Sequence, residues 1–247
     1  MADSDPHCRQ AADDLIAILS ILRERDVITS PVSDVSVHGS LTWCQPCRGK
    51  RPNSRKCQGW RGTFHETTAV EIPFTISRNE IVARISGHFS FERRTPPKRL
   101  AGWQSAPASS ASFAIELRRV ANNDLCARHH IDLANPSQAG PTWHVQLGGL
   151  ATGERRHKEL EWLDVPRWPA LPMDMVLVLE LAIYNFCHER WKELRATNPW
   201  RDIVKRSEEL MHSHYLERLS KYRNQKEAGH SWLAYQCNQT SDWPRPV

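Results

Sequence analysis

The sequence predicts an α+β fold: an N-terminal helix, an antiparallel sheet of about five strands, and C-terminal helices packed on one face of the sheet. Three observations predict it. Apolar residues near the N-terminus recur at helical spacing, the middle of the chain alternates between apolar and polar residues, and the final part returns to helical spacing. Elements in this order place helices together on one side of an antiparallel sheet.

The composition and length fit one globular domain. The chain has 247 residues, of which 40% are apolar and 25% charged, and 33 basic residues against 28 acidic ones give a formal charge of +5. This profile excludes a collagen-like, coiled-coil or wholly disordered chain. We expect a single α+β domain over residues 1–247, with the N-terminal helix in 1–35, mostly β structure in 36–150 and a helical part in 151–247.

The sequence shows no segment typical of a membrane or secreted protein. Its longest apolar run, Met173 to Ile183, is interrupted by Asp174 and Glu180 and is shorter than a membrane helix of ~20 residues. The N-terminus has no apolar core behind a basic start, so it predicts no secretory signal. Seven cysteines, an odd number, do not predict a disulfide scaffold. We therefore expect a cytoplasmic protein that does not bind membranes.

The first helix is predicted over Gln10 to Arg25. Asp13 and Asp14 lie in its early turns, where the helix dipole favours negative charge. Its apolar residues share one face: Ala11, Leu15, Ile18, Leu19 and Leu22.

Alternation of apolar and polar residues predicts the strands. The clearest example has Ile81, Ile85 and Phe89 on one parity and Arg84 and His88 on the other, as a half-buried antiparallel strand requires. The predicted strands are Trp60–Ile76, Glu80–Phe91, Phe113–Val120, Arg128–Leu133 and Thr142–Leu147, with a loop over Thr95–Ser112.

Two helices are predicted in the C-terminal part. Pro172 opens a run that is apolar on almost every side, so this helix should be buried, lying across the sheet. Asn198 and Pro199 form a cap and first-turn pair for the second helix, which continues to about Gln225 with one apolar stripe.

The basic segment 43–65 contains the spacing of a zinc site. Cys44-Gln45-Pro46-Cys47 is a pair that presents two thiolates to one metal ion, and Cys57 and His65 would complete a tetrahedral set. Because such a segment gains little from burial, a structural zinc ion would order it. A surface loop with incidental thiols would contain the same residues, so both interpretations stay open.

The same segment is the strongest basic patch of the chain. No acidic residue lies between Cys44 and His65. The cations there favour contact with phosphates, and Trp43 and Trp60 flank them as stacking groups for bases. This pattern predicts nucleic-acid binding, with a solvated loop as the alternative. The cations are Arg48, Lys50, Arg51, Arg55, Lys56 and Arg61.

The last two predicted strands carry titratable groups on one side. If they pair with their apolar sides together, the register must keep equal parity, for example with Asp132 opposite His144 and His130 opposite Gln146. Glu116 would join from the neighbouring strand. Imidazoles and carboxylates hold divalent metals and move protons, which predicts a hydrolase site. The outer face of an ordinary sheet alternates in the same way, so this alternative stays open.

Residues 113–190 resemble uncharacterised bacterial proteins. The similarity rests on a strand with His or Asp, on Trp143-His144-Val145-Gln146-Leu147-Gly148-Gly149, and on Arg167-Trp168-Pro169 followed by Pro172-Met173-Asp174 before an apolar helix. The resemblance implies a bacterial origin among defence or mobile-element genes. It implies no known reaction.

The order of elements also resembles the ubiquitin-conjugating enzyme fold. That fold has an N-terminal helix, an antiparallel sheet and a long irregular stretch before a helix, here with Trp162 and Trp168. Its activity needs a cysteine after a His-Pro-Asn-like segment. Asn135-Pro136 is present, but no cysteine follows until Cys187. This resemblance therefore implies a catalytically inactive relative.

Three functional hypotheses follow. The first is a non-enzymatic binding component of a bacterial assembly, with a protein partner and with nucleic acid bound through residues 44–65. The second is a metal-dependent hydrolase or nuclease that uses His130, Asp132 and His144 with a divalent metal ion. The third is the inactive relative of ubiquitin-conjugating enzymes.

Overall fold

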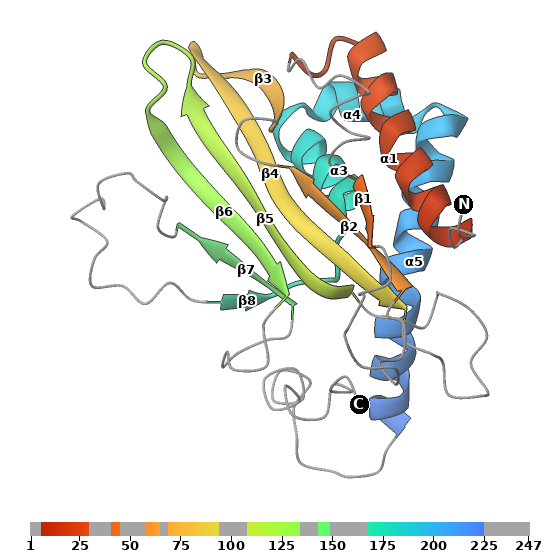
Figure 1. Ribbon diagram of the computed structural model, residues 1–247. Coiled ribbons are helices and arrows are strands. Elements are labelled where there is room, and N and C mark those ends of the chain that lie inside the picture. Colours follow the sequence, from red (N-terminus) through yellow and green to blue (C-terminus); the bar gives the residue numbers. More distant parts are fainter. Residues whose placement is uncertain are drawn as a thin grey trace.

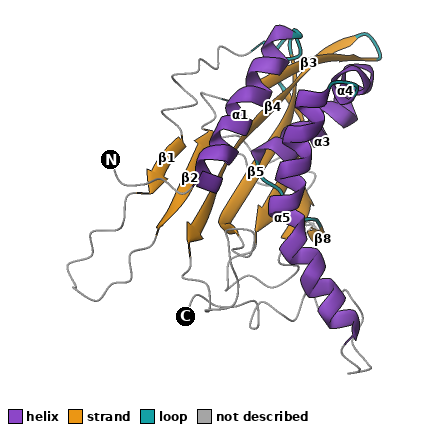
Figure 2. Cartoon of the chain, turned by 90° about the vertical axis from the view of Figure 1, so that its right-hand side faces the viewer, coloured by secondary structure: helices purple, strands orange, loops and turns teal. Residues whose placement is uncertain are grey.

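The α+β fold is confirmed by a computed structural model, which describes residues 6–29, 41–44, 58–64, 69–93, 108–133, 143–148 and 167–224. All the described helices lie on one side of one antiparallel sheet (Figures 1 and 2). The helices are α1 (Pro6–Glu24), α3 (Met175–Phe186), α4 (His188–Arg195) and α5 (Asn198–Asn224). None of these described helices is long and apolar enough to cross a membrane.

The sheet has eight strands in the described residues, in the order β1-β2-β4-β5-β6-β7-β8, with β3 also paired to β4. The sequence predicted about five. The strands are β1 (Leu41–Cys44), β2 (Gln58–Phe64), β3 (Val70–Ile76), β4 (Asn79–Arg93), β5 (Ala108–Arg119), β6 (Leu125–Leu133), β7 (Trp143–Leu147) and β8 (Arg167–Pro169). The strands β1 and β8 are too short to show a periodic pattern.

The strand predicted over Trp60–Ile76 is wrong, because this stretch forms both β2 and β3. The two strands share one partner, the 15-residue strand β4. The strand β3 pairs with residues 79–85 of β4, and β2 pairs with residues 87–93. Both strands pair with the same edge of β4, and residues that favour strands continue from one to the other. The alternation of apolar and polar residues therefore does not reveal where β2 ends and β3 begins.

The core lies between the sheet and the helices. On the sheet it contains Phe113 of β5 opposite Ile131 of β6, and Ile85 of β4 opposite Ile115 of β5, all of them buried. The helix α3 supplies Val178 and Leu179 and packs against β4 and β5, so the predicted buried helix across the sheet is confirmed. The predicted start is wrong: α3 begins after Asp174, whose carboxylate caps it by accepting from Leu177 N at 3.0 Å.

The other helices surround α3. The helix α4, which the sequence did not predict, follows Cys187 directly, and α5 begins at the predicted Asn198. The helix α1 begins at Pro6, four residues before the predicted start. Arg206 of α5 donates to both carboxylate oxygens of Asp14 on α1, at 2.9 and 2.6 Å. This bidentate pair fastens the two helices together.

Candidate functional site

The side of the sheet that faces away from the helices carries the predicted titratable groups in the predicted register. Asp132 lies opposite His144, and His130 lies opposite Gln146. The alternate residues of these strands point to the helices, where Ile131 is buried. We call this far side the polar side of the sheet. The strands β6 and β7 keep the predicted equal parity, because a slip by one residue would move Ile131 out of the core.

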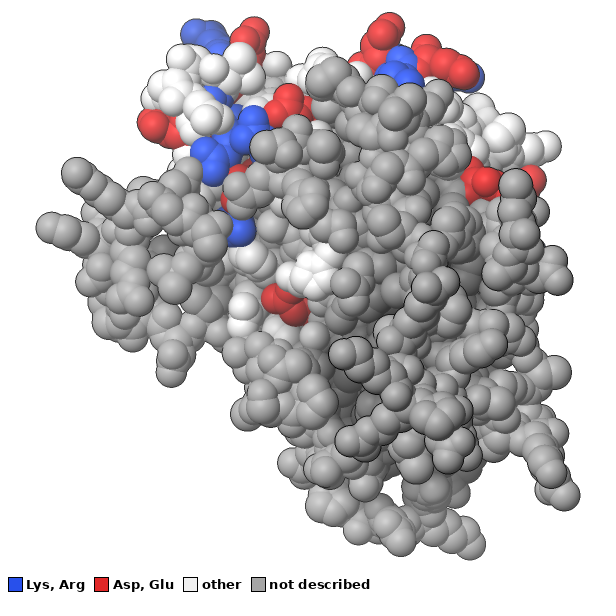
Figure 3. All heavy atoms as spheres, viewed as in Figure 1, with Lys and Arg blue, Asp and Glu red and all other residues white. Residues whose placement is uncertain are grey.

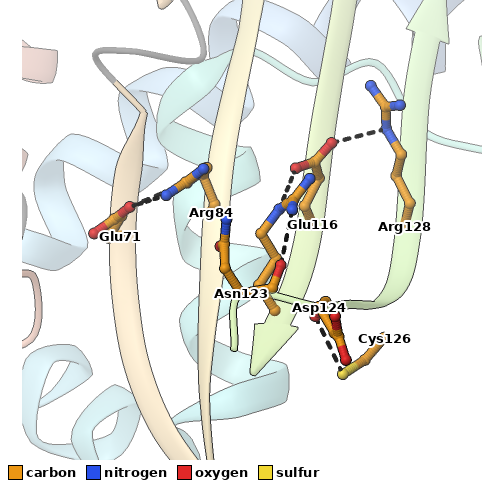
Figure 4. Close-up of polar contacts among 8 residues, drawn as sticks. Glu71, Arg84, Glu116, Asn123, Asp124, Cys126 and Arg128 are labelled. Atoms are coloured by element: carbon orange, nitrogen blue, oxygen red, sulfur yellow. Dashed lines mark hydrogen bonds and ion pairs between the residues drawn. The ribbon is translucent and has the colours of Figure 1, made fainter. Parts of the chain in front are cut away.

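A row of alternating charges crosses the polar side of the sheet. Glu71, Arg84, Glu116 and Arg128 are successive neighbours on β3, β4, β5 and β6 (Figure 4). Arg84 donates from Nε and Nη2 to Glu71 Oε1, at 3.0 and 2.8 Å. Glu116 Oε1 lies 3.3 Å from Arg128 Nε. Opposite charges in neighbouring strands stabilise the sheet through these cross-strand pairs.

Glu116, which was predicted to join a catalytic group, lies between two guanidinium groups. Its Oε2 accepts from Arg118 Nε at 2.9 Å, and its side chain is 8% exposed. Arg118 also donates from Nη1 to the carbonyl of Asn123, at 3.1 Å, in the turn between β5 and β6. The carboxylate therefore holds arginines in place.

The imidazole groups of the polar side differ in accessibility. His144 is only 1% exposed, although it lies on the predicted side. His130 is half-buried, and burial lowers its pKa, with a further lowering from the nearby charge of Arg128. Its Nε2 has no hydrogen-bond partner among the described residues. Burial likewise lowers the pKa of His129, which lies on the other side of the strand.

No group of three His, Cys, Asp or Glu side chains in the described ranges is arranged to hold a metal ion. Most of the predicted zinc set, Cys47, Cys57 and His65, lies outside these ranges. Cys44 ends β1 opposite Gly59 of β2. Zinc binding thus stays a prediction. The predicted cations Arg48, Lys50, Arg51, Arg55 and Lys56 also lie outside the described residues.

The strands that flank the basic segment form an antiparallel pair at the edge of the sheet. Trp43 of β1 lies opposite Trp60 of β2, which in turn lies opposite Phe91 of β4. Arg61, the one predicted cation within a described strand, lies opposite Thr42. The register therefore sets three aromatic positions in one row, beside the connection that carries the other five cations.

The helical layer contains a polar group that the sequence analysis missed. Glu180 of α3 is 8% exposed and accepts three hydrogen bonds. Trp191 Nε1 and Arg195 Nε donate to Oε1 at 2.7 and 2.6 Å, and Trp200 Nε1 donates to Oε2 at 2.6 Å. The sequence contains one signal for this group: Glu180 is the single acidic residue within an apolar helix, and two tryptophans follow it. Buried carboxylates require such donors.

Beside Glu180, the three C-terminal helices enclose an open pocket of about 210 Å³. Its walls are mostly apolar, and Glu180 and Arg195 are the charged residues of the lining. The lining residues are Met173, Leu177, Glu180, Leu181, Tyr184, Trp191, Arg195 and His212.

No protein-family model, curated protein or solved structure matches this chain.

Proposed function

We propose that the chain is a non-enzymatic component of an assembly and binds nucleic acid through its basic segment, residues 44–65. The observation that carries this proposal is the antiparallel register of β1 with β2. It makes residues 45–57 the connection between two paired strands, and this connection contains five cations and no acidic residue. We call it the basic connection.

The aromatic row at the same edge supports the proposal. Trp43, Trp60 and Phe91 hold neighbouring positions across three strands. Basic side chains beside aromatic ones are the combination with which proteins bind single-stranded nucleic acid, through phosphates and stacked bases. The proposal includes a structural zinc ion bound by Cys44, Cys47, Cys57 and His65, because such an ion would hold the basic connection at this edge of the sheet.

The arginines of the polar side of the sheet do not offer a comparable surface. Arg84 is paired with Glu71, and Arg118 and Arg128 lie against Glu116. On the face of the molecule in Figure 3, acidic and basic side chains of the described residues lie close together. Because a phosphate backbone is attracted by uncompensated cations, the basic connection is the favoured contact.

The test is fluorescence anisotropy with labelled single-stranded RNA, single-stranded DNA and duplex DNA of about 20 nucleotides. The variant Arg51→Glu, Arg55→Glu, Lys56→Glu is compared with a control that reverses three cations elsewhere, Arg190→Glu, Lys192→Glu, Lys205→Glu. The control side chains are exposed by 53%, 55% and 73%. We expect the first variant to bind at least about tenfold more weakly and with a smaller salt dependence.

Equal weakening by both triple variants would show only a response to net charge and would contradict the proposal. Binding that does not change with salt would also contradict it, because phosphate contacts release counterions. Metal analysis of the purified protein tests zinc separately. We expect about one zinc ion per chain, which Cys44→Ser with Cys47→Ser removes.

A metal-dependent hydrolase is the second candidate. The observation that favours it is the shared position of His130, Asp132 and His144 on neighbouring strands of the polar side. Incubation of RNA and DNA with Mg²⁺, Mn²⁺ or EDTA separates it from the first candidate. Metal-dependent cleavage that His144→Ala abolishes supports the hydrolase, whereas binding without turnover supports the non-enzymatic component.

A further inference from the structure

The outward side of α3 carries an apolar stripe that the other described helices cover only in part: Leu177 is buried and Leu181 is partly buried. Leu177, Leu181 and Tyr184 follow one another at spacings of four and three residues, so they share a face, and Met173 extends it just before the helix. Tyr184 is 46% exposed. A helix that is apolar on nearly every side is normally buried on every side, but the described residues cover this stripe incompletely.

A cation, Arg195, also lines the groove, beside Glu180. Both oxygens of Glu180 already accept hydrogen bonds from Trp191, Arg195 and Trp200. Arg195 uses Nε for that bond, its Nη2 lies 3.9 Å from Glu208, and its side chain is 34% exposed. Arg195 therefore lines the groove as a partly exposed cation, and His212, a further polar residue of the lining, has Nε2 2.9 Å from Pro172 O.

We propose that this groove binds an amphipathic helix of a partner protein that carries an acidic residue beside its apolar stripe. From Met173 to Tyr184 the groove spans 11 steps along the chain, or roughly 16 Å, which matches about three turns of a partner helix. Apolar side chains of the partner occupy the pocket against Leu181, and its carboxylate pairs with Arg195. This is the groove mode of helix recognition, with a cation that sets the orientation.

The chemistry of the walls agrees with a protein partner. Trp191, Tyr184 and Arg195 are the three residue types that contribute most often to binding energy in protein interfaces. They already form one cluster: the rings of Tyr184 and Trp191 lie 4.9 Å apart edge to face, and the Arg195 guanidinium lies 5.7 Å from the Trp191 ring centre. The inference does not depend on nucleic-acid binding, because the groove lies in the helical layer.

The probe is a display library of randomised peptides of about 14 residues, long enough for the groove. The library is selected on the full chain and counter-selected on the variant Leu181→Glu, Tyr184→Asp. We expect enriched peptides to carry apolar residues at positions i, i+3 or i+4, and i+7, with Asp or Glu beside them. Enrichment of basic peptides, or of none with this pattern, would overturn the proposal.

Direct titration of an enriched peptide then measures the affinity by anisotropy. We expect Tyr184→Asp alone to weaken binding at least about tenfold. The control Leu216→Asp replaces an apolar residue of α5 that is 53% exposed and does not line the pocket, and it should leave the affinity unchanged. Replacing the acidic residue of the peptide with Gln should weaken binding about three- to tenfold and reduce the salt dependence.

Two other occupants are outcomes of the same experiment. If octanoate displaces the peptide and binds with higher affinity, the groove is a site for aliphatic acids, and the helix proposal fails. If sedimentation shows a dimer that Tyr184→Asp dissociates, the occupant is a second copy of the chain, and the proposal also fails. Because Tyr184 is exposed, we expect its substitution to leave the fold intact, so the titration with Tyr184→Asp tests the proposal even if the variant with Leu181→Glu does not fold.

Discussion

Trp200 of α5 donates its indole N–H to the carboxylate of Glu180 on α3 across 2.6 Å, in a position where both side chains are buried. The same carboxylate accepts from Trp191 and Arg195 of α4. One acidic side chain therefore connects three helices. Its removal would leave the buried Trp200 donor and two partly buried donors without their acceptor, which costs more than the loss of a surface ion pair.

We predict that Glu180→Ala lowers the free energy of unfolding by about 3 kcal/mol, because one buried and two partly buried donors lose their acceptor. The control is Glu193→Ala in α4, whose 3.1 Å pair with Arg190 is exposed and should contribute less than about 0.5 kcal/mol. Urea unfolding followed by circular dichroism measures both. Similar losses in the two variants would show that Glu180 has no special structural role.

Gly87 provides a second test of the fold, at the centre of β4. It lies opposite Phe64 of β2 and Phe113 of β5, and its φ is 154°. A Cβ atom there would collide with the carbonyl oxygen of Ser112 and approach Phe113 Cα to 2.8 Å. Because both contacts are backbone atoms, the strands would have to separate.

Gly87→Ala should therefore destabilise the protein by about 3 kcal/mol or more, through steric collision and backbone strain. The neighbouring substitution Ser86→Ala, which adds no atom, should cost less than about 1 kcal/mol. Thermal unfolding of the two variants distinguishes them. An unfolding temperature for Gly87→Ala equal to that of the native chain would mean that β4 and β5 are less closely paired than described.

The side of the sheet that each residue of β6 and β7 takes could be predicted from the sequence, because side-chain alternation excludes a slip by one residue and leaves only slips by two. Ile131 had to face the helices, so Asp132 and His144 had to share the opposite side. The burial of His144 could not be predicted, because alternation defines which side of a sheet a residue takes and not what covers that side.

Other features depend on contacts that no local pattern contains. The separation of β2 from β3 reflects their common partner β4, a relationship between distant segments. The acceptor role of Glu180 depends on Trp200, 20 residues further along the chain, and on the turn that brings α5 back to α3. The helix α4 is short and polar, and its isolated propensity is too weak to define it.

His130 should show a depressed pKa in a titration followed by NMR of the imidazole protons. Its burial disfavours the charged form, and so does the positive charge of Arg128. We expect a value below the ordinary one of about 6.5. In Arg128→Gln the value should rise, although burial keeps it below the ordinary value. A titration at or above 6.5 in the native chain would contradict the described burial.

The lowered pKa of His130 also predicts how the stability of the protein depends on pH. When the folded pKa of a histidine is depressed, the unfolded chain binds more protons, so the contribution of His130 to stability is present above about 6.5 and is lost as the pH falls through the folded pKa. His130→Gln should reduce the decline of the unfolding free energy below about pH 6.5. Because burial also lowers the pKa of His129, the double variant should reduce the decline further.

Asp174 should show the opposite pH dependence. Its carboxylate is buried at the start of α3, where burial raises its pKa despite hydrogen bonds from Ser207 and Leu177 N. For an acid with a raised folded pKa, the folded state binds more protons. The contribution to stability is therefore fully present below the unfolded value of about 3.9 and is lost as the pH rises through the folded pKa.

The variant Asp174→Asn isolates this effect, since its carbonyl can still accept from Leu177 N and its amide can donate to Ser207. We expect the stability of the native chain relative to Asp174→Asn to fall as the pH is raised from about 4 to about 8, in urea unfolding at each pH. Asp174→Ala loses the cap itself, so it should cost about 1 kcal/mol or more at every pH. If the native chain instead gains stability over Asp174→Asn as the pH rises, the ionised carboxylate is the favoured form, and its hydrogen bonds outweigh the cost of its burial.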